Sequence, residues 1–115
     1  MSGIPDFVDL ALQLPGASRV DHERYSAWKV AGSTFGYLWE PTRTVGLKQT
    51  LAEQLALVAM RPEAFEVQFT MGAFGWVVVH LEQVERDELA ELTFEAWRLT
   101  APAQSVAERA DRLPV

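Results

Sequence analysis

The sequence predicts an α+β protein in which helices pack against an antiparallel β-sheet of about five strands. Apolar residues recur with helical spacing in three segments, and the segments between them alternate apolar and polar residues as strands do. Turns that contain glycine or proline separate the strand-like segments. The expected order of elements is therefore α-β-β-β-α-β-β-α.

The chain is expected to open with a helix over residues 5–14. Its apolar stripe consists of Phe7, Leu10, Ala11 and Leu14. A Pro-Gly pair follows and ends the helix. Residues 17–26 are polar, unpatterned and rich in both charge signs, which indicates a surface loop, and loops of this kind often carry function.

A meander of three strands is expected next. The short segment AWKV forms the first strand, and a glycine turn leads into the second, TFGYLWE. In the second strand the aromatic residues Phe35, Tyr37 and Trp39 alternate on one side. Pro41 favours a turn, after which TVGLKQ returns as the third strand.

The middle of the chain predicts a helix and then a hairpin. Thr50 and Glu53 have the spacing of a capping box, so the second helix begins there, with a stripe of Leu51, Leu55, Val58 and Ala59. The hairpin follows as an alternating strand, FEVQFT, and the stretch MGAFGWVVVH. Gly72 and Gly75 can supply positive φ angles for the turn, and the apolar run after them is typical of a strand covered on both faces.

The third helix is expected from Arg86 to Pro102, with an apolar stripe of Leu89, Leu92, Ala96 and Leu99. At 115 residues the chain suits one domain, and we assign it to residues 1–102. Residues 103–115 form a C-terminal tail. Ser105 and Glu108 have the spacing of a capping box, but apolar residues are few, so a short helix and a frayed end both stay open.

Composition excludes several classes of function. The net charge of −6 repels nucleic acid on average, so binding DNA would need a local basic patch. The chain has no cysteine, which excludes disulfides, thiolate metal sites and a cysteine nucleophile. No apolar run approaches the length of a membrane helix and no signal peptide is evident, so we expect a cytoplasmic protein without a membrane partner.

The sequence contains no motif of an active site. Serines stand in no nucleophile-elbow setting, and no glycine pattern forms a phosphate-binding loop, so we expect a protein that is not an enzyme and needs no cofactor. His22 and His80 are the candidate metal ligands if the fold brings them together. Zinc sites have spacings that this chain lacks, which favours a solvated His22 and a hydrogen-bonded His80.

The first half of the chain concentrates basic and aromatic residues suited to nucleic acid. Candidate phosphate contacts are Arg24, Lys29, Arg43 and Lys48. Tyr37 and Trp39 are candidate stacking residues, because every base offers a π-face. Ordinary surface ion pairs and burial of the aromatic rings in the core are the alternative interpretations of the same residues.

Five segments, taken in order, resemble the MmcQ/YjbR-like family of small bacterial proteins. These segments are LALQLPGA, YSAWKVAGSTFGYL, TVGLKQT, GAFGWVVVHL and DELAELTFEAWRLTAP. The resemblance covers about residues 5–102. The chain departs from the family pattern at Trp28, where phenylalanine is frequent, and at Ala31 and Ser33, where glycine and lysine are usual.

The resemblance implies an α+β fold like that of frataxin and CyaY, and it carries a family label of DNA binding that rests on likeness to a double-wing DNA-binding motif. It offers no catalytic residues. Three functions follow as hypotheses: a binding module for DNA, a small-ligand or metal-binding domain that uses the 17–26 loop, and a protein-interaction domain. We expect a monomer or a weak homodimer, and an exposed apolar patch would indicate the third function.

Overall fold

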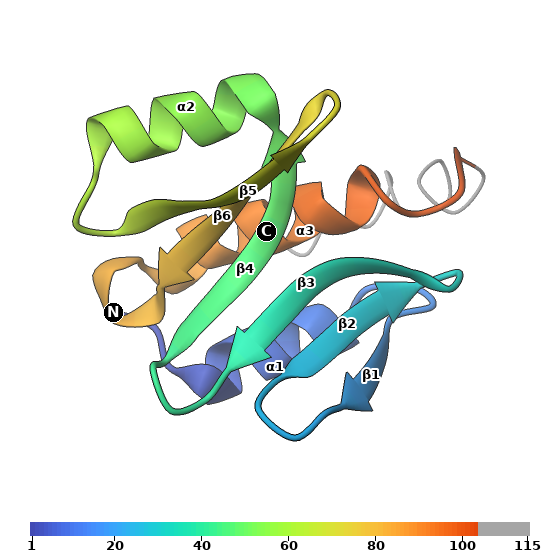
Figure 1. Cartoon of the computed structure of the whole chain (residues 1–115). Coiled ribbons are helices and arrows are strands. Elements are labelled where there is room, and N and C mark those ends of the chain that lie inside the picture. The colour runs from blue at the N-terminus through green and yellow to red at the C-terminus, as the bar shows by residue number, and fades with distance from the viewer. Residues whose placement is uncertain (104–115) are drawn as a thin grey trace.

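The computed structural model of the protein describes residues 1–103 as a six-stranded antiparallel sheet with helices packed on one face (Figure 1). The elements are α1 (Ile4–Leu12), β1 (Ser18–Asp21), β2 (Ser26–Val30), β3 (Ser33–Trp39), β4 (Thr44–Thr50), α2 (Leu51–Met60), β5 (Phe65–Met71), β6 (Phe74–His80), the 3-10 turn η1 (Leu81–Gln83) and α3 (Arg86–Arg98). The strands lie in the order β1-β2-β3-β4-β6-β5. The predicted fold class is confirmed, whereas the capping residues predicted in the tail lie outside the described residues.

One strand was missed in the prediction, because the segment 17–26 was interpreted as a loop. Ser18–Asp21 forms the edge strand β1, which pairs antiparallel with β2, and the His22 amide donates to the Tyr25 carbonyl oxygen at 2.8 Å to close the connection. All four residues of β1 are exposed. An edge strand without a buried side shows no apolar alternation, so only its backbone pairing reveals it.

The predicted aromatic stripe of β3 is divided between the two faces of the sheet. The register with β2 shifts between Trp28 and Lys29, and Phe35 is left without a partner in the pairing. A bulge of this kind places two successive residues on about the same side of the strand. The alternation of side chains between the two faces of the sheet is therefore reversed beyond it. Phe35 is fully buried among the helices, whereas Tyr37 and Trp39 lie half-buried on the opposite face.

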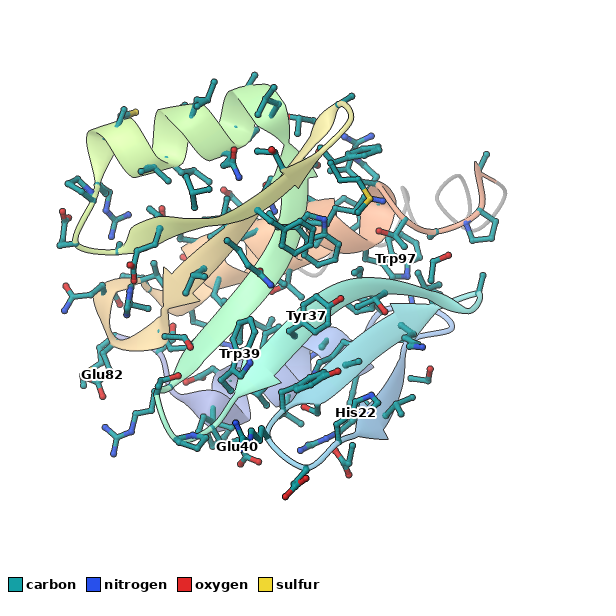
Figure 2. All side chains as sticks on the ribbon, in the orientation of Figure 1. His22, Tyr37, Trp39, Glu40, Glu82 and Trp97 are labelled. Atoms are coloured by element: carbon teal, nitrogen blue, oxygen red, sulfur yellow. The ribbon has the colours of Figure 1, made fainter. Side chains whose placement is uncertain are left out.

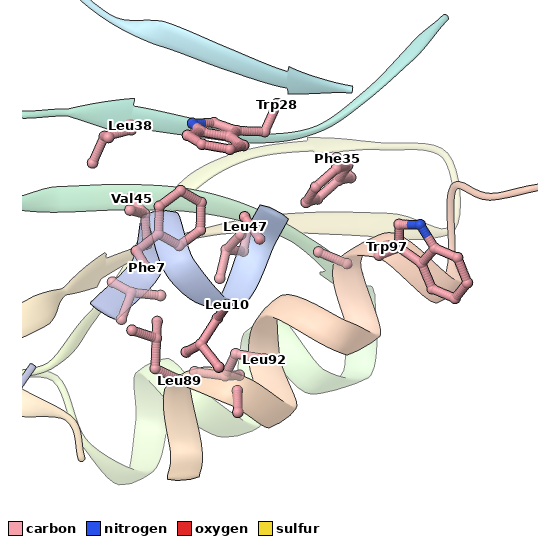
Figure 3. Packing of buried hydrophobic residues seen from close by; sticks show 14 of the residues in the cluster. Phe7, Leu10, Trp28, Phe35, Leu38, Val45, Leu47, Leu89, Leu92 and Trp97 are labelled. Atoms are coloured by element: carbon pink, nitrogen blue, oxygen red, sulfur yellow. The ribbon is translucent and has the colours of Figure 1, made fainter. Parts of the chain in front are cut away.

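The main core lies between the sheet and the helices α1 and α3 (Figure 3). The ring of Phe7 on α1 meets that of Trp28 on β2 edge to face, with centroids 5.3 Å apart. Trp97 on α3 is also fully buried, and its indole Nε1 donates to the Pro15 carbonyl oxygen at 2.9 Å. The predicted stripe is confirmed for α1 and, in α3, at Leu89, Leu92 and Ala96, whereas Ala90, Thr93 and Trp97 are also buried and Leu99 follows the end of the helix.

Helix α2 begins as predicted but buries a different side. The Glu53 amide donates to the Thr50 hydroxyl at 3.1 Å, which confirms the N-cap. The predicted inward stripe is wrong at Leu51, Leu55 and Ala59, because all three are exposed. The buried residue is Gln54, whose Nε2 donates to the carbonyl oxygens of Phe69 at 3.0 Å and Trp76 at 2.9 Å.

The two glycines of the β5–β6 hairpin have different purposes. Gly72 has φ +61° and lies in the two-residue turn between Met71 and Phe74. Gly75 is not among the positive-φ glycines. A Cβ there would lie 2.6 Å from the Cβ of Gln54, so Gly75 is needed for the close approach of α2 to β6.

Helix α2 lies on the same face of the sheet as α3. Gly75 pairs directly with Gln49, and directly paired residues point to the same face. Gln49 donates to the Leu92 carbonyl oxygen of α3 at 3.1 Å, and Gly75 meets Gln54 of α2. Among residues 1–103, no helix covers the other face of the sheet. In the same residues, none of the helices is long and apolar enough to cross a membrane.

Acid should weaken the N-terminal helix through Asp6. The Gly3 amide donates to its carboxylate at 2.8 Å, and Arg86 pairs with it at 2.7 Å. The backbone hydrogen bond first, and Arg86 second, lower the pKa of Asp6 below its usual value. Because the folded-state pKa is depressed, the stabilisation is present above the unfolded-state pKa, about 4, and is lost as the pH falls through the folded-state value.

We therefore expect Asp6→Asn to flatten the dependence of stability on pH in the acid range. Urea unfolding of the wild type and the variant, measured at neutral pH and at several values below about pH 4, gives the comparison. The free energy of unfolding should fall more steeply with acid in the wild type. Parallel curves for the two proteins would show that Asp6 does not contribute to acid sensitivity.

Candidate functional site

A run of touching aromatic rings crosses the face of the sheet that the described helices leave open. We call Tyr25, Tyr37, Trp39, Phe69 and Trp76 the aromatic face. Ring centroids are 5.7 Å apart for Tyr25 and Tyr37, 5.9 Å for Tyr37 and Trp39, 5.4 Å for Tyr37 and Trp76, and 5.2 Å for Phe69 and Trp76. Figure 2 shows Tyr37 and Trp39 standing in front of the sheet, away from the helices. Tyr37, which touches three other rings, is the centre of the aromatic face.

Small neighbours on the adjacent strands make room for the central ring. Tyr37 pairs directly with Ala27 on β2 and with Gly46 on β4. Direct partners share a face, so large side chains at either position would compete for the same space. At the other end of the aromatic face, Phe69 and Trp76 are direct partners on β5 and β6, and their rings stack.

Gln68 extends from β5 over Gly46 and carries an unsatisfied acceptor. The register of β5 shifts between Val67 and Phe69, which brings Gln68 to the side of the aromatic face. A Cβ on Gly46 would overlap the side-chain amide of Gln68 and lie 3.1 Å from Cη2 of Trp39. The Gln68 Oε1 atom is buried, and no donor in residues 1–103 reaches it. A buried hydrogen-bond acceptor without a donor therefore lies beside the aromatic face.

Two of the four predicted phosphate contacts lie on the same side of the sheet as the aromatic face. Lys29 on β2 points away from the core residue Trp28, and Lys48 on β4 pairs directly with Trp76. The Nζ atom of Lys48 lies 4.2 Å from the centroid of the Phe74 ring. Within residues 1–103 neither lysine forms an ion pair with a carboxylate.

The two predicted arginines lie outside the aromatic face. Arg24 is in the β1–β2 loop, at the margin of the sheet. Arg43 is in the β3–β4 turn, where it has φ +54° and pairs with Glu82. The charge of Arg43 is thus compensated, and Glu82 lies at the end of the sheet in Figure 2.

The structure does not bring His22 and His80 together. His22 stacks on Tyr25 with centroids 4.7 Å apart, in the β1–β2 loop. His80 ends β6 and pairs with Glu66. Strands β2, β3 and β4, spaced about 4.8 Å apart, lie between them. Residues 1–103 contain no group of three or more histidine or acidic side chains arranged to hold a metal ion.

Comparison with known proteins identifies the family of the chain. A sequence model of the YjbR family matches residues 12–99, which is most of the chain. The chain belongs to the YjbR family. The solved structures include a similar fold, the crystal structure of Deinococcus radiodurans protein DR2400, a DUF419-domain protein, with a TM-score of 0.75. The two chains are 18% identical over 86% of this chain and 78% of the other, so this likeness concerns the fold. No curated protein matches the chain.

This YjbR chain also has a hollow of about 600 Å³ at the end of the sheet where the β1–β2 loop meets the β3–β4 turn. Both signs of charge line it, since Arg19, Arg24, Asp21, Glu23 and Glu40 contribute together with His22. Arg19 pairs with Asp21 at 2.7 Å and with Glu40 at 3.7 Å. Figure 2 shows His22 and Glu40 at this same end. The hollow contains His22 but not His80.

Two of the five residues of the aromatic face of this YjbR chain, Tyr37 and Trp39, were named from the sequence. Tyr25 lies in a segment without any pattern, and Phe69 was expected on the buried side of its strand. Trp76 opens an apolar run that was interpreted as covered on both faces by the protein. The available signal was the alternation of sides along this run. Trp76, Val78 and His80 lie on one side of the strand and Val77 and Val79 on the other, and only Val77 and Val79 belong to the core cluster.

Proposed function

We propose that this YjbR-family chain is a non-enzymatic module that binds single-stranded nucleic acid on its aromatic face. The observation that carries the proposal is the run of five touching rings on the open side of the sheet, where Trp76 is buried and the other four rings are partly exposed, with Lys29 and Lys48 beside it. Unpaired bases stack on aromatic side chains, and each such contact contributes about 1–3 kcal/mol. Lysines beside the rings suit the phosphates that link the bases.

Charge favours a single strand over a duplex in this proposal. The net charge of −6 opposes any polyanion, and two lysines on the face provide only limited compensation. Stacking adds affinity that does not depend on charge, but the bases of a duplex are already stacked on one another.

The test is fluorescence anisotropy of a labelled single-stranded oligonucleotide titrated with the full chain at low and physiological salt. We expect Tyr37→Ala to weaken binding roughly 5- to 150-fold, which corresponds to the loss of about 1–3 kcal/mol of stacking. Tyr37→Phe is the matched control, because it keeps the ring and should bind like the wild type. Circular dichroism on each variant confirms that it is folded.

The salt dependence separates phosphate contacts from stacking. Lys48→Gln should reduce the slope of log K against log salt by about 0.7, as expected for one phosphate of a single strand. Arg98→Gln is the control for charge alone, because Arg98 lies on α3 and pairs with Glu95 on the other side of the molecule. Absence of binding to the single strand at low salt, or equal affinity of Tyr37→Ala and the wild type, would overturn the proposal. Tighter binding to a duplex than to a single strand would indicate that the DNA binding implied by the family resemblance uses another surface.

A second candidate function is the binding of a small polar ligand in the hollow beside His22. Its volume is within the usual range of ligand sites, roughly 300–1,000 Å³. The mixed charges that line it suit a ligand with both an acidic and a basic group. Amide NMR shifts confined to residues 19–26 and 38–41 on addition of free amino acids would support this function, whereas an unchanged spectrum would exclude that ligand class.

A further inference from the structure

A groove of about 360 Å³ lies between α2 and α3, on the face of the sheet that the helices cover (Figure 1). We call it the α2–α3 groove. Helix α2 contributes Glu53 and Leu57 to its lining. The lining side chains of α3 are Glu88, Glu91, Leu92 and Glu95. The volume is within the usual range of ligand sites, roughly 300–1,000 Å³, and the groove lies on the opposite side of the sheet from the aromatic face.

The α2–α3 groove is lined by carboxylates and by no basic side chain. Glu88 and Glu95 are each compensated by an arginine that does not line the groove. Glu53 and Glu91 form no ion pair within residues 1–103, and the cap of α2 uses the backbone amide of Glu53, which leaves its carboxylate available. The uncompensated charge favours a ligand with more than one positive charge.

Gln49 adds a buried acceptor to the floor of the α2–α3 groove. Its side chain comes from β4, beneath the helices, and is only 1% exposed. The Nε2 atom donates to the Leu92 carbonyl oxygen at 3.1 Å, which fixes the orientation of the planar amide. The Oε1 atom accepts no hydrogen bond from residues 1–103 and is not among the polar atoms sealed from solvent there, so it opens into the groove. Because the other polar side chains of the lining are acceptors, its donor comes from outside the chain.

The carboxylates of the α2–α3 groove stand in a row rather than around one point. On α3, Glu88, Glu91 and Glu95 share one stripe and are about 4.5 Å and about 6 Å apart along the helix axis. Residues 1–103 contain no group of three or more acidic or histidine side chains arranged to hold a metal ion. A ligand whose positive charges also stand in a row therefore fits the groove better than a single metal ion.

We propose that the α2–α3 groove binds a linear aliphatic polyamine, with its ammonium groups on the carboxylates and on the Oε1 atom of Gln49. Three or four methylenes separate neighbouring ammonium groups by about 5 Å or about 6 Å, because each bond of the chain is about 1.5 Å long. These distances match the spacing of the α3 carboxylates. The methylenes lie against Leu57 and Leu92, as the stem of a lysine lies on apolar surface. An ammonium group offers only donors to a lining that offers acceptors.

Isothermal titration calorimetry of the full chain with spermidine, at low salt and without nucleic acid, tests this inference. Glu53→Gln and Glu91→Gln should each raise the Kd roughly two- to fivefold, the contribution of one solvent-accessible ion pair, and the double variant should show about the product of the two factors. Asp87→Asn is the matched control, because it removes one exposed charge from the same helix outside the groove. It should bind spermidine like the wild type.

A second variant tests the buried acceptor. Gln49→Met keeps the length of the side chain and removes the amide, so the Kd for spermidine should rise at least about fivefold. The amide NMR spectrum of the variant shows whether it is folded. A folded Gln49→Met variant with unchanged affinity would remove the acceptor from the site and overturn the proposal in this form.

The location of the NMR shifts separates a built site from general attraction to an acidic protein. In the wild type, spermidine should shift amides of residues 49–57 and 88–95, and butylamine, with a single ammonium group, should bind more weakly. Shifts spread over the other acidic surfaces, or an unchanged Kd in the double variant, would overturn the proposal. Tighter binding of a trilysine peptide with the same charge as spermidine would also overturn it and assign the groove to a basic segment of a protein.

The two proposals for this chain fail independently. Tyr37→Ala should leave the affinity for spermidine unchanged, because Tyr37 lies on the opposite side of the sheet from the α2–α3 groove. The Glu53→Gln and Glu91→Gln double variant should still bind the single-stranded oligonucleotide at least as well as the wild type, because it removes negative charge away from the aromatic face. Loss of one activity without the other therefore identifies which proposal is wrong.

Discussion

Trp28→Ala is expected to lower the free energy of unfolding by about 3–5 kcal/mol, the usual cost of removing a large aromatic side chain from a core. Trp28 is fully buried, and its ring packs edge to face against Phe7, which connects β2 to α1. Its Nε1 donates to the Ser26 hydroxyl at 3.2 Å, so the substitution also removes a hydrogen bond in the buried layer. Small domains are stable by only about 5–15 kcal/mol, so most of the stability would be lost.

Urea denaturation followed by circular dichroism measures this effect. Trp39→Ala is the matched control, because it removes the same side chain from the neighbouring strand but on the open side of the sheet, where Trp39 is half-buried. Its cost should be clearly smaller, on the order of 1 kcal/mol. Equal losses for the two tryptophans would contradict the assignment of Trp28 to the core and Trp39 to the aromatic face.

Gly75→Ala is expected to destabilise the protein by about 1–3 kcal/mol, the usual cost of overpacking. The added methyl group would lie 2.6 Å from both Cβ and Cδ of Gln54. Rotation of the glutamine side chain cannot move its own Cβ away, so the backbone of α2 must shift from β6. That shift also strains the two hydrogen bonds from Gln54 to the strand carbonyls.

Gly46→Ala is the comparison that isolates this mechanism. There the methyl group meets mainly the far end of the flexible Gln68 side chain, which can rotate away, so the loss of stability should be smaller. Equilibrium unfolding in urea ranks the two variants. If Gly46→Ala were the more destabilised, the packing of Gln68 on the aromatic face would matter more than the contact between α2 and β6. Gly46→Ala should also alter binding of the oligonucleotide, because it displaces Gln68.

Periodicity of single elements was a good guide where one side of an element is buried. The stripe of α1 and three of the four stripe residues of α3 were predicted correctly, and the N-cap at Thr50 was recognised from its spacing to Glu53. These features depend on contacts within a few residues of the chain, so the local sequence contains the information that specifies them. The family resemblance added the fold, and the YjbR match confirms it.

Periodicity failed where contacts between different elements decide the outcome. Strand β1 exists only through its pairing with β2, and the bulge opposite Trp28 and Lys29 reverses which side of β3 is buried. In α2 the missing side chain at Gly75 admits Gln54, which turns the apolar residues outward. For β1 and β3 the partner is the next strand of the same hairpin, and for α2 it is a strand further along the chain, so in each case the pattern within a single element does not contain the partner.

The sequence by itself therefore determined the class of fold, the segments that form α1 and α3, and the absence of cysteine chemistry. It also supplied the residues of the aromatic face, but not their arrangement. Only the tertiary structure decided that Tyr25, Tyr37, Trp39, Phe69 and Trp76 share one open side of the sheet, and that Leu51 and Leu55 of α2 are exposed. The physical reason is that contacts between side chains of different elements set the strand register and the rotation of each helix. The residue pattern of a single strand or helix does not specify those contacts.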